Sequence, residues 1–342
     1  ILAVGFGFLP GTVVDQHFSQ RDRLPRLRNA LEARPGRVGL GIDERTAIEV
    51  HGRRITVIGE GRVTVLLAAG AGRPERIEHL TAGNTTDLTR LRRAARDRAG
   101  PAHAVELRVP AGPVFLGGGD DLPSGAADDF VRRAGGDAAR IVVVDTGGGE
   151  RTEALLEAVR AGAPESCNLF LPSGSLQLVD VLAESTGVWF VGPRPWEVLD
   201  RFGDDALRRA LQELLARGGA IGASGAVGSV LASSMVRGDP LDDEILFAEG
   251  YDQGLGVLSG FAIDLRGGVP RETSELRRLV APDGAMYALV LDPDAVAIVE
   301  HSTIRVLGEG SVRVVQAGDG DGPKIAVVEA PTTFDYLTWR PR

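Results

Sequence analysis

The chain has 342 residues, of which 43% are hydrophobic and 25% charged, as in a soluble globular protein long enough for two domains. Its formal net charge of −9 argues against binding nucleic acid, because that needs a basic face. No apolar stretch reaches the roughly 20 residues of a membrane span, so no membrane partner is expected. The single cysteine, Cys167, excludes an internal disulfide and predicts a reducing, cytoplasmic compartment.

The chain starts at Ile1, and its first nine residues resemble neither a signal peptide nor the beginning of a helix. We therefore expect that it opens inside a domain.

The first functional pattern follows at residues 12–28. A short apolar run ends in Gln16, His17 and Phe18, which predicts a strand that carries a histidine at its end. Guanidinium groups then crowd the start of a predicted helix: Arg21, Arg23, Arg26 and Arg28. Histidine suits proton transfer near neutral pH, and arginine forks suit carboxylates. The alternative interpretation is a buried histidine beside a solvated basic helix.

A second apolar run, residues 38–50, contains Glu44, which could orient His17 as the acid of a triad does. It leads into a predicted strand-turn-strand unit at residues 54–66, RITVIGEGRVTVL.

An internal repeat organises the rest of the chain. When the sequence is shifted by 249 positions, the difference between Asp264 and Asp15, the same glycines and apolar residues recur without a gap. We therefore predict the C-terminal part of a first copy at residues 1–91, a linker at 92–112, a complete second copy at 113–318 and a tail at 319–342.

In the second copy, apolar runs alternate with helical patterns of ten or more residues. This alternation predicts an α/β fold with a doubly wound, mostly parallel sheet and helices on both faces. Candidate sites in such sheets lie at the carboxyl ends of strands. Ser224 lies there, between small residues and before an apolar helix predicted at residues 230–235. It is a candidate nucleophile at a strained strand-to-helix turn; a closely packed glycine-rich corner is the alternative.

The sequence DQHFSQRDRLPRL followed by GLGIDERTAIEV resembles the signature of the cyanophycinase-like serine peptidases, relatives of peptidase E. The resemblance implies a peptidase E-like fold of the class I glutamine amidotransferase-like type, duplicated here. It implies His17, Glu44 and Ser224 as catalytic residues. The implied substrate-binding residues are Gln16, Arg21, Arg23 and Arg26. The implied activity is hydrolysis of an aspartyl-arginine polymer to β-aspartyl-arginine, or of a related acidic or isoaspartyl peptide.

The second copy departs from this pattern. The positions that match His17 and Glu44 are Arg266 and Pro293, and those of Arg21 and Arg23 are Pro270 and Glu272. A serine without a general base is a poor nucleophile, so we expect a degenerate copy. The serine of the first copy is expected upstream of Ile1, and the chain alone is expected to be inactive.

A non-catalytic binding or assembly protein is the alternative function. No Cys/His or HExxH spacing indicates a metal, and no cofactor is predicted. The expected partners are a peptide rich in aspartate and arginine, together with either a homodimer or intramolecular pairing of the two copies.

Overall fold

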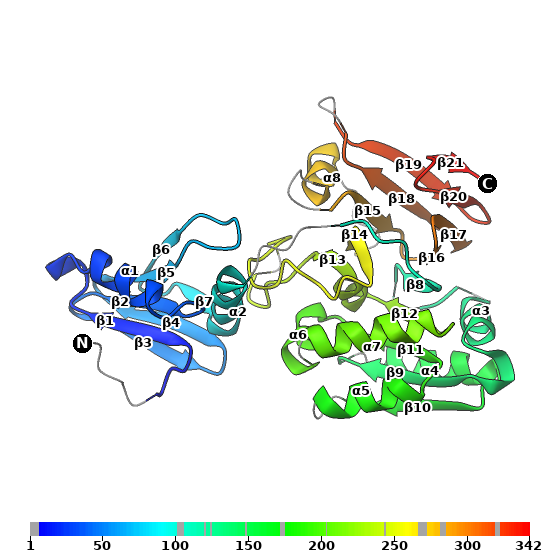
Figure 1. Cartoon of the computed structure of the whole chain (residues 1–342), viewed down its shortest axis with the longest axis horizontal. Helices are drawn as coiled ribbons and strands as arrows, with labels where there is room; N and C mark the ends of the chain where they lie inside the picture. The colour runs from blue at the N-terminus through cyan, green and yellow to red at the C-terminus, as the bar shows by residue number, and fades with distance from the viewer. Residues whose placement is uncertain are drawn as a thin grey trace. The chain divides into compact units, whose positions relative to one another are not determined.

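The structure is a computed structural model. It describes residues 7–100, 106–119, 121–123, 125–147, 149–171, 175–202, 204–242, 244–265, 272–280, 285–318 and 322–342. The chain divides into two compact units: unit 1 comprises residues 1–104 and 237–252, and unit 2 comprises residues 105–236 and 253–342. The elements are labelled in Figure 1.

Unit 1 contains two small sheets. Its strands are β1 (Thr12–Gln16), β2 (Val38–Ile42), β3 (Thr46–His51), β4 (Arg54–Gly59), β5 (Arg62–Leu67), β6 (Arg76–Thr81) and β7 (Thr85–Asp87). One sheet has the order β1-β2-β5-β6, with β1 and β2 parallel and the other pairs antiparallel. The other sheet, β3-β4-β7, is antiparallel. A 3-10 helix, η1 (Ser19–Arg21), and α1 (Leu24–Glu32) connect β1 to β2, and α2 (Leu88–Ala99) follows β7.

Alternation along β2 divides the core of unit 1. Val38 and Leu40 are fully buried in a cluster with residues of β4, β5 and α2. The intervening residues of β2 are glycines, and α1 lies over them, so that a side chain at Gly39 would meet Leu27 at 3.1 Å. Both faces of β2 are therefore covered, as expected for a strand in a parallel pair.

Unit 2 contains a larger α/β sheet. Within the described residues this sheet has the order β10-β9-β11-β12-β8-β16-β17-β20-β21. The strands from β10 to β8 are parallel, and β16 and β17 continue the sheet in antiparallel pairs. A second sheet has the order β13-β14-β15-β18-β19. The architecture is thus mixed α/β with a largely parallel central sheet.

The parallel strands of unit 2 and the helices between them are β8 (Val114–Gly117), α3 (Ala126–Arg133), η2 (Gly136–Ala138), β9 (Arg140–Asp145), α4 (Glu150–Ala161), β10 (Ser166–Phe170), α5 (Ser175–Glu184), β11 (Gly187–Val191), α6 (Pro195–Phe202), α7 (Asp204–Ala216) and β12 (Ala220–Ser224). The remaining elements are η3 (Ala226–Leu231), β13 (Ala232–Met235), β14 (Leu258–Asp264), α8 (Thr273–Leu279), β15 (Tyr287–Leu291), β16 (Ala295–Glu300), β17 (Thr303–Gly308), β18 (Ser311–Gln316), β19 (Lys324–Glu329), β20 (Thr333–Asp335) and β21 (Arg340–Pro341).

Helices cover the parallel strands of unit 2. Ile141 and Val143 of β9 belong to a buried cluster with residues of α3 and α4. Val142 and Val144 alternate with them and are equally buried, while α5, α6 and α7 lie side by side along the strands in Figure 1. Strands buried on both faces need apolar residues at every position, which explains the continuous run in β9.

The prediction of a helix at residues 230–235 is wrong. The chain instead forms η3 and then β13, which pairs in parallel with β14. The Ser229 hydroxyl donates to the carbonyl oxygens of Ala226 and Val236 at 3.0 and 3.1 Å, respectively. The neighbouring strand and this side chain bond the backbone groups that a helix would have bonded internally.

The strand pairings of unit 1 recur in unit 2. The pairs Thr12–Val38 and Gly39–Leu66 correspond, after a shift of 249 positions, to Phe261–Tyr287 and Ala288–Val315. The pairing of Thr46 with Gly59 corresponds in the same way to a pairing of β16 with β17. The two Gly-Glu-Gly turns therefore connect matching strands, β4 to β5 and β17 to β18.

Two element boundaries differ from those expected from sequence. Helix α2 extends to Ala99, into the first part of the region treated as a linker, and β19, β20 and β21 lie in the region treated as a tail. None of the described helices has the length and apolarity that a bilayer crossing requires.

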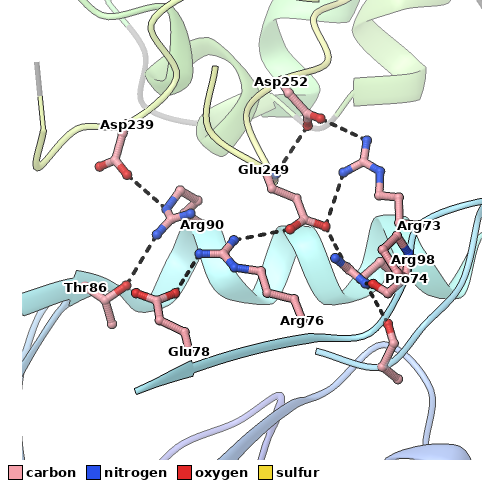
Figure 2. A network of polar contacts seen from close by, with 12 residues as sticks. Arg73, Pro74, Arg76, Glu78, Thr86, Arg90, Arg98, Asp239, Glu249 and Asp252 are labelled. Atoms are coloured by element: carbon pink, nitrogen blue, oxygen red, sulfur yellow. Dashed lines mark hydrogen bonds and ion pairs between the residues drawn. The ribbon is translucent and has the colours of Figure 1, made fainter. Parts of the chain in front are cut away.

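Residues 237–252, which are called the arm here, belong to unit 1 although they lie between β13 and β14 in sequence. Figure 2 shows how carboxylates of the arm meet arginines of unit 1. Glu249 pairs with Arg98, and also with Arg73 and Arg76 at 3.3 and 3.2 Å. Asp252 pairs with Arg73 at 2.9 Å. The arm therefore supplies carboxylates to a cluster of arginines of unit 1, of which Arg98 is the most buried.

Other contacts of the arm are equally specific. Asp239 pairs with Arg90 at 3.1 Å, and both side chains are at most 9% exposed. Tyr251 is fully buried, with the Arg93 guanidinium 5.4 Å from its ring centroid, a cation–π distance. Arg93 also donates to the carbonyl oxygen of Gly250 at 3.0 Å. Because the arm contributes both a buried aromatic ring and buried charges, it is an integral part of unit 1.

We predict that Glu249→Gln destabilises the full chain by about 2–3 kcal/mol, because Arg98 remains buried without its counter-charge. Burial raises the pKa of Glu249, but the hydrogen bond and charge of Arg98, with Arg76 and Arg73, outweigh it and leave this pKa below 4.5. A lowered carboxyl pKa stabilises the fold above the unfolded pKa, and this stabilisation is lost as the pH falls through the folded pKa.

The measurement is urea unfolding of the full chain at pH 7 and at decreasing pH. The difference between wild type and variant should be complete at pH 7 and should shrink below about pH 4.5. Glu244→Gln, an exposed change on the same arm, is the matched control. A Glu249 variant as stable as this control would contradict the role given to the arm.

Candidate functional site

His17 directly follows β1 and adopts a left-handed backbone conformation with φ of 52°. This region is uncommon for residues other than glycine, and such strain persists only when the surroundings impose it. Here the constraint comes from the next residue, Phe18. Its side chain is 4% exposed, and its backbone N–H donates to the carbonyl oxygen of Ile42 at 3.1 Å. The chain after β1 is thereby fixed beside the end of β2.

Phe18 depends on a glycine in β2. A Cβ atom at Gly41 would lie 2.4–2.5 Å from carbon atoms of the Phe18 ring, well inside van der Waals contact. The ring therefore rests directly on the backbone of the strand. It belongs to a buried cluster with Leu27, Leu31 and Leu66, which ties η1 and α1 to the sheet.

The histidine faces the predicted acid. His17 Nδ1 lies 3.0 Å from Glu44 Oε1, with the two side chains 47% and 50% exposed. An ionised carboxylate only accepts hydrogen bonds, so neutral His17 carries its proton on Nδ1, which leaves Nε2 as an acceptor. This is the orientation of a general base that is held by an acid.

The predicted arginines differ in their surroundings. Arg23 donates to Asp15 at 2.7 Å, and Arg26 lies 3.4 Å from the other oxygen of the same carboxylate. Asp15 is only 6% exposed, so the Arg23 guanidinium is directed into the protein. Arg21 is exposed and forms no ion pair within the part of the chain that the structure describes. Arg21, and to a lesser degree Arg26, are therefore the cations available to a ligand.

Gln16, an expected substrate contact, is the exposed last residue of β1. The role of its neighbour Asp15 was missed by the sequence analysis. Asp15 was noted only as a repeated residue, although its burial could have been inferred from its position inside an apolar strand, and it determines which arginines remain free.

Ser224 lies in unit 2, as the last residue of β12. Its side chain is 2% exposed, and its hydroxyl accepts a hydrogen bond from the indole N–H of Trp189 at 3.2 Å. The sharp turn comes one residue later, because Gly225 has φ of 72° and ψ of −171°. Ser224 thus has the backbone conformation of a strand residue, with its hydroxyl directed into the core. Arg266 and Pro270 lie outside the described residues.

Comparison with known proteins finds a short region of similarity to cyanophycinases. The chain is 47% identical over 66 residues to a cyanophycinase of Geminocystis herdmanii, covering 19% of this chain and 24% of the relative. It is 48% identical over 67 residues to that of Synechococcus elongatus, covering 19% and 20%. The chain thus spans a quarter or less of the length of the curated relatives it matches. A part of it is related to cyanophycinases.

No family model matches the chain. Among solved structures, a peptidase from an acI-B1 Actinobacterium aligns with a TM-score of 0.47 and 14% identity over 68% of this chain and 98% of that one.

We predict that Gly41→Ala displaces the Phe18 ring and with it His17. The added methyl group should cost about 1–3 kcal/mol, as overpacking of a filled core does. Denaturant unfolding measures this cost, and a crystal structure of the variant measures the separation of His17 and Glu44. Gly100→Ala is the control, because its φ is −82° and its nearest neighbour lies 3.5 Å away. Unchanged stability with an intact pair would contradict the dependence of the histidine on this packing.

We also predict that Ser224 does not react with a fluorophosphonate probe in the folded chain, because its hydroxyl is buried and bonded to Trp189. Mass spectrometry of the treated full chain reports any adduct, and a serine hydrolase of known activity in the same tube is the positive control. Labelling of Ser224 that disappears in His17→Ala would contradict this prediction and indicate a composite site.

Proposed function

We propose that unit 1 supplies the base, the orienting acid and the substrate-binding cations of a cyanophycinase-like serine peptidase. The observation that carries the proposal is the pair of His17 Nδ1 and Glu44 Oε1 at 3.0 Å, with the exposed Arg21 in the segment that follows His17. The local similarity to cyanophycinases supports the same assignment.

In the proposed mechanism a serine hydroxyl attacks the amide carbonyl of the substrate. His17 Nε2 accepts the hydroxyl proton as the serine oxygen–carbon bond forms, and it then gives this proton to the leaving amine as the amide C–N bond breaks. Glu44 accepts from Nδ1 and stabilises the imidazolium ion between these steps. Water then hydrolyses the acyl-enzyme with His17 again as the base, and the product carboxylate is released.

The proposed substrate carries free carboxylates. Arg21 and Arg26 project carboxylate-binding groups from the segment that carries the histidine, while Arg23 holds that segment through Asp15. Gln16 lies next to the histidine and offers amide donors and an acceptor. A polymer of aspartate with arginine on its side chains, cleaved to β-aspartyl-arginine, fits this set. A smaller acidic or isoaspartyl peptide is the second substrate class.

We propose further that the chain contains two copies of one fold, the second degenerate. The pairings among β1–β5 recur among β14–β18 at the shift of 249 positions, and those of β6 and β7 recur in β19 and β20 at a shift of 248, which supports this. Within the described residues, unit 1 has no counterpart of the parallel strands β8 to β12 that precede them in unit 2. On this proposal the serine that works with His17 comes from a segment outside these 342 residues, and the chain alone is inactive.

The alternative function is that of a non-catalytic binding or assembly module. The burial of Ser224 favours it, because this serine is the only candidate nucleophile that the sequence pattern identifies. The two proposals differ in whether an acidic peptide is cleaved or only bound.

We predict that the full-length gene product releases β-aspartyl-arginine from the polymer. His17→Ala should lower kcat about 10²–10⁴-fold because it removes the general base. Arg21→Ala should instead lower kcat/KM about 10–100-fold, mainly through KM, because it removes a carboxylate contact.

Chromatography of the released dipeptide measures the kinetics of both variants. Arg37→Ala, which changes an exposed arginine of the same unit, is the control. Binding of the peptide by calorimetry without any hydrolysis would overturn the peptidase in favour of the binding module.

A further inference from the structure

The loop that carries His17 and the loop that carries Glu44 are joined by two bonds between a side chain and the backbone. Asp43 Oδ1 accepts from the backbone N–H of Ser19 at 2.9 Å. In the opposite direction, Gln20 Oε1 accepts from the backbone N–H of Glu44 at 3.1 Å. The two bridges cross between the same segments as the catalytic pair, so they fix its spacing.

One of the hydrogen bonds that Asp43 accepts is also found in unit 2. Asp43 Oδ2 also accepts from the backbone N–H of Arg62 at 3.4 Å. In unit 2 the matching residue, Asp292, accepts from the backbone N–H of Ser311 at 3.0 Å. The aspartate therefore holds the following strand in both units, with or without a histidine nearby.

The Gln20 bridge has no such counterpart. The residue that matches Gln20 after the 249-position shift is Val269, whose aliphatic side chain has no hydrogen-bond acceptor. The residue that matches Glu44 is Pro293, which has no backbone N–H to donate. Acceptor and donor are thus both missing in the unit that also lacks the histidine and the glutamate. The Gln20 bridge therefore occurs in the unit that has the catalytic pair and has no equivalent in the unit that shares only the strand pairings.

The exposed pair needs a restraint from outside, and the hydrogen bond between Gln20 and the Glu44 backbone is called the brace. His17 and Glu44 are about half exposed, so burial does not restrict their rotamers. Catalysis by such a pair requires that its loops be held in place, since misplacement of about 1 Å can cost orders of magnitude in rate. Gln20 restrains the backbone of Glu44 itself, and it does so from the loop of the histidine.

We propose that Gln20 is a positioning residue that holds Glu44 against His17 through the backbone amide of Glu44. This inference rests on the proposed function for its catalytic meaning, but its structural part does not. Because Gln20 acts through Glu44, its loss should change the chemical step and not the binding of substrate.

The first experiment needs no activity. Hydrogen exchange of the Glu44 backbone amide is measured by NMR in the full chain, in Gln20→Ala and in Gln20→Glu, which keeps an acceptor. Exchange should become about fivefold faster in Gln20→Ala and stay near wild type in Gln20→Glu. Gln212→Ala, an exposed glutamine of α7, is the matched control. Unchanged exchange in Gln20→Ala would overturn the brace whether or not the protein is a peptidase.

The second experiment uses the full-length gene product and the aspartyl-arginine polymer. Gln20→Ala should lower kcat about tenfold with KM unchanged, and Gln20→Glu should restore most of it. A raised KM at constant kcat would mean that Gln20 contacts substrate, and this would overturn the positioning role. If no variant and no wild type hydrolyses the polymer, the proposed function fails, and the exchange experiment alone decides the brace.

Discussion

The packing of Phe18 on the bare backbone of Gly41 is the constraint on which the candidate site depends. Strands β1 and β2 are parallel and paired from Thr12 to Gln16, so their carboxyl ends lie next to each other. The residues after each strand leave the sheet at the same edge. Anchoring Phe18 at this edge forces His17 into its left-handed conformation and directs the imidazole toward Glu44. The energetic cost of the strained residue is offset by burial of the neighbouring ring.

The sequence predicted this edge because its signals are local. Two apolar runs, each followed by a residue of catalytic type, indicate two adjacent strand ends once the sheet is inferred to be parallel. The closeness of His17 and Glu44 follows from this. Most elements of unit 2 were predicted for a different reason, namely that buried apolar strands alternate with helices along the chain. The predicted helix at residues 230–235 failed because its apolar residues satisfy a strand as well as a helix, and pairing with β14 decides between them.

Other features depend on contacts that no local pattern encodes. Nothing in the sequence distinguishes Arg21, Arg23 and Arg26. Only the structure shows that Arg23, and to a lesser degree Arg26, pair with the buried Asp15. Ser224 has small neighbours suited to a nucleophile turn, but a tryptophan on the adjacent strand places its hydroxyl in the core. The arm is separated from the arginines that it meets by well over a hundred residues, and charge alone cannot select one acidic segment among several in a chain with 47 acidic residues.

Under the proposed duplication, the two units show which requirements belong to the fold and which to the chemistry. Both keep the strand registers and the aspartate that binds the next strand. Val290 stands where unit 1 has Gly41, so a branched side chain replaces the bare backbone on which the Phe18 ring rests in unit 1. Pro293 removes both the carboxylate and the amide that Gln20 would hold. A sheet gains packing from a valine in place of a glycine, since a buried strand favours β-branched residues. A copy released from catalysis can therefore fill this space, whereas the copy that keeps His17 must leave it to Phe18.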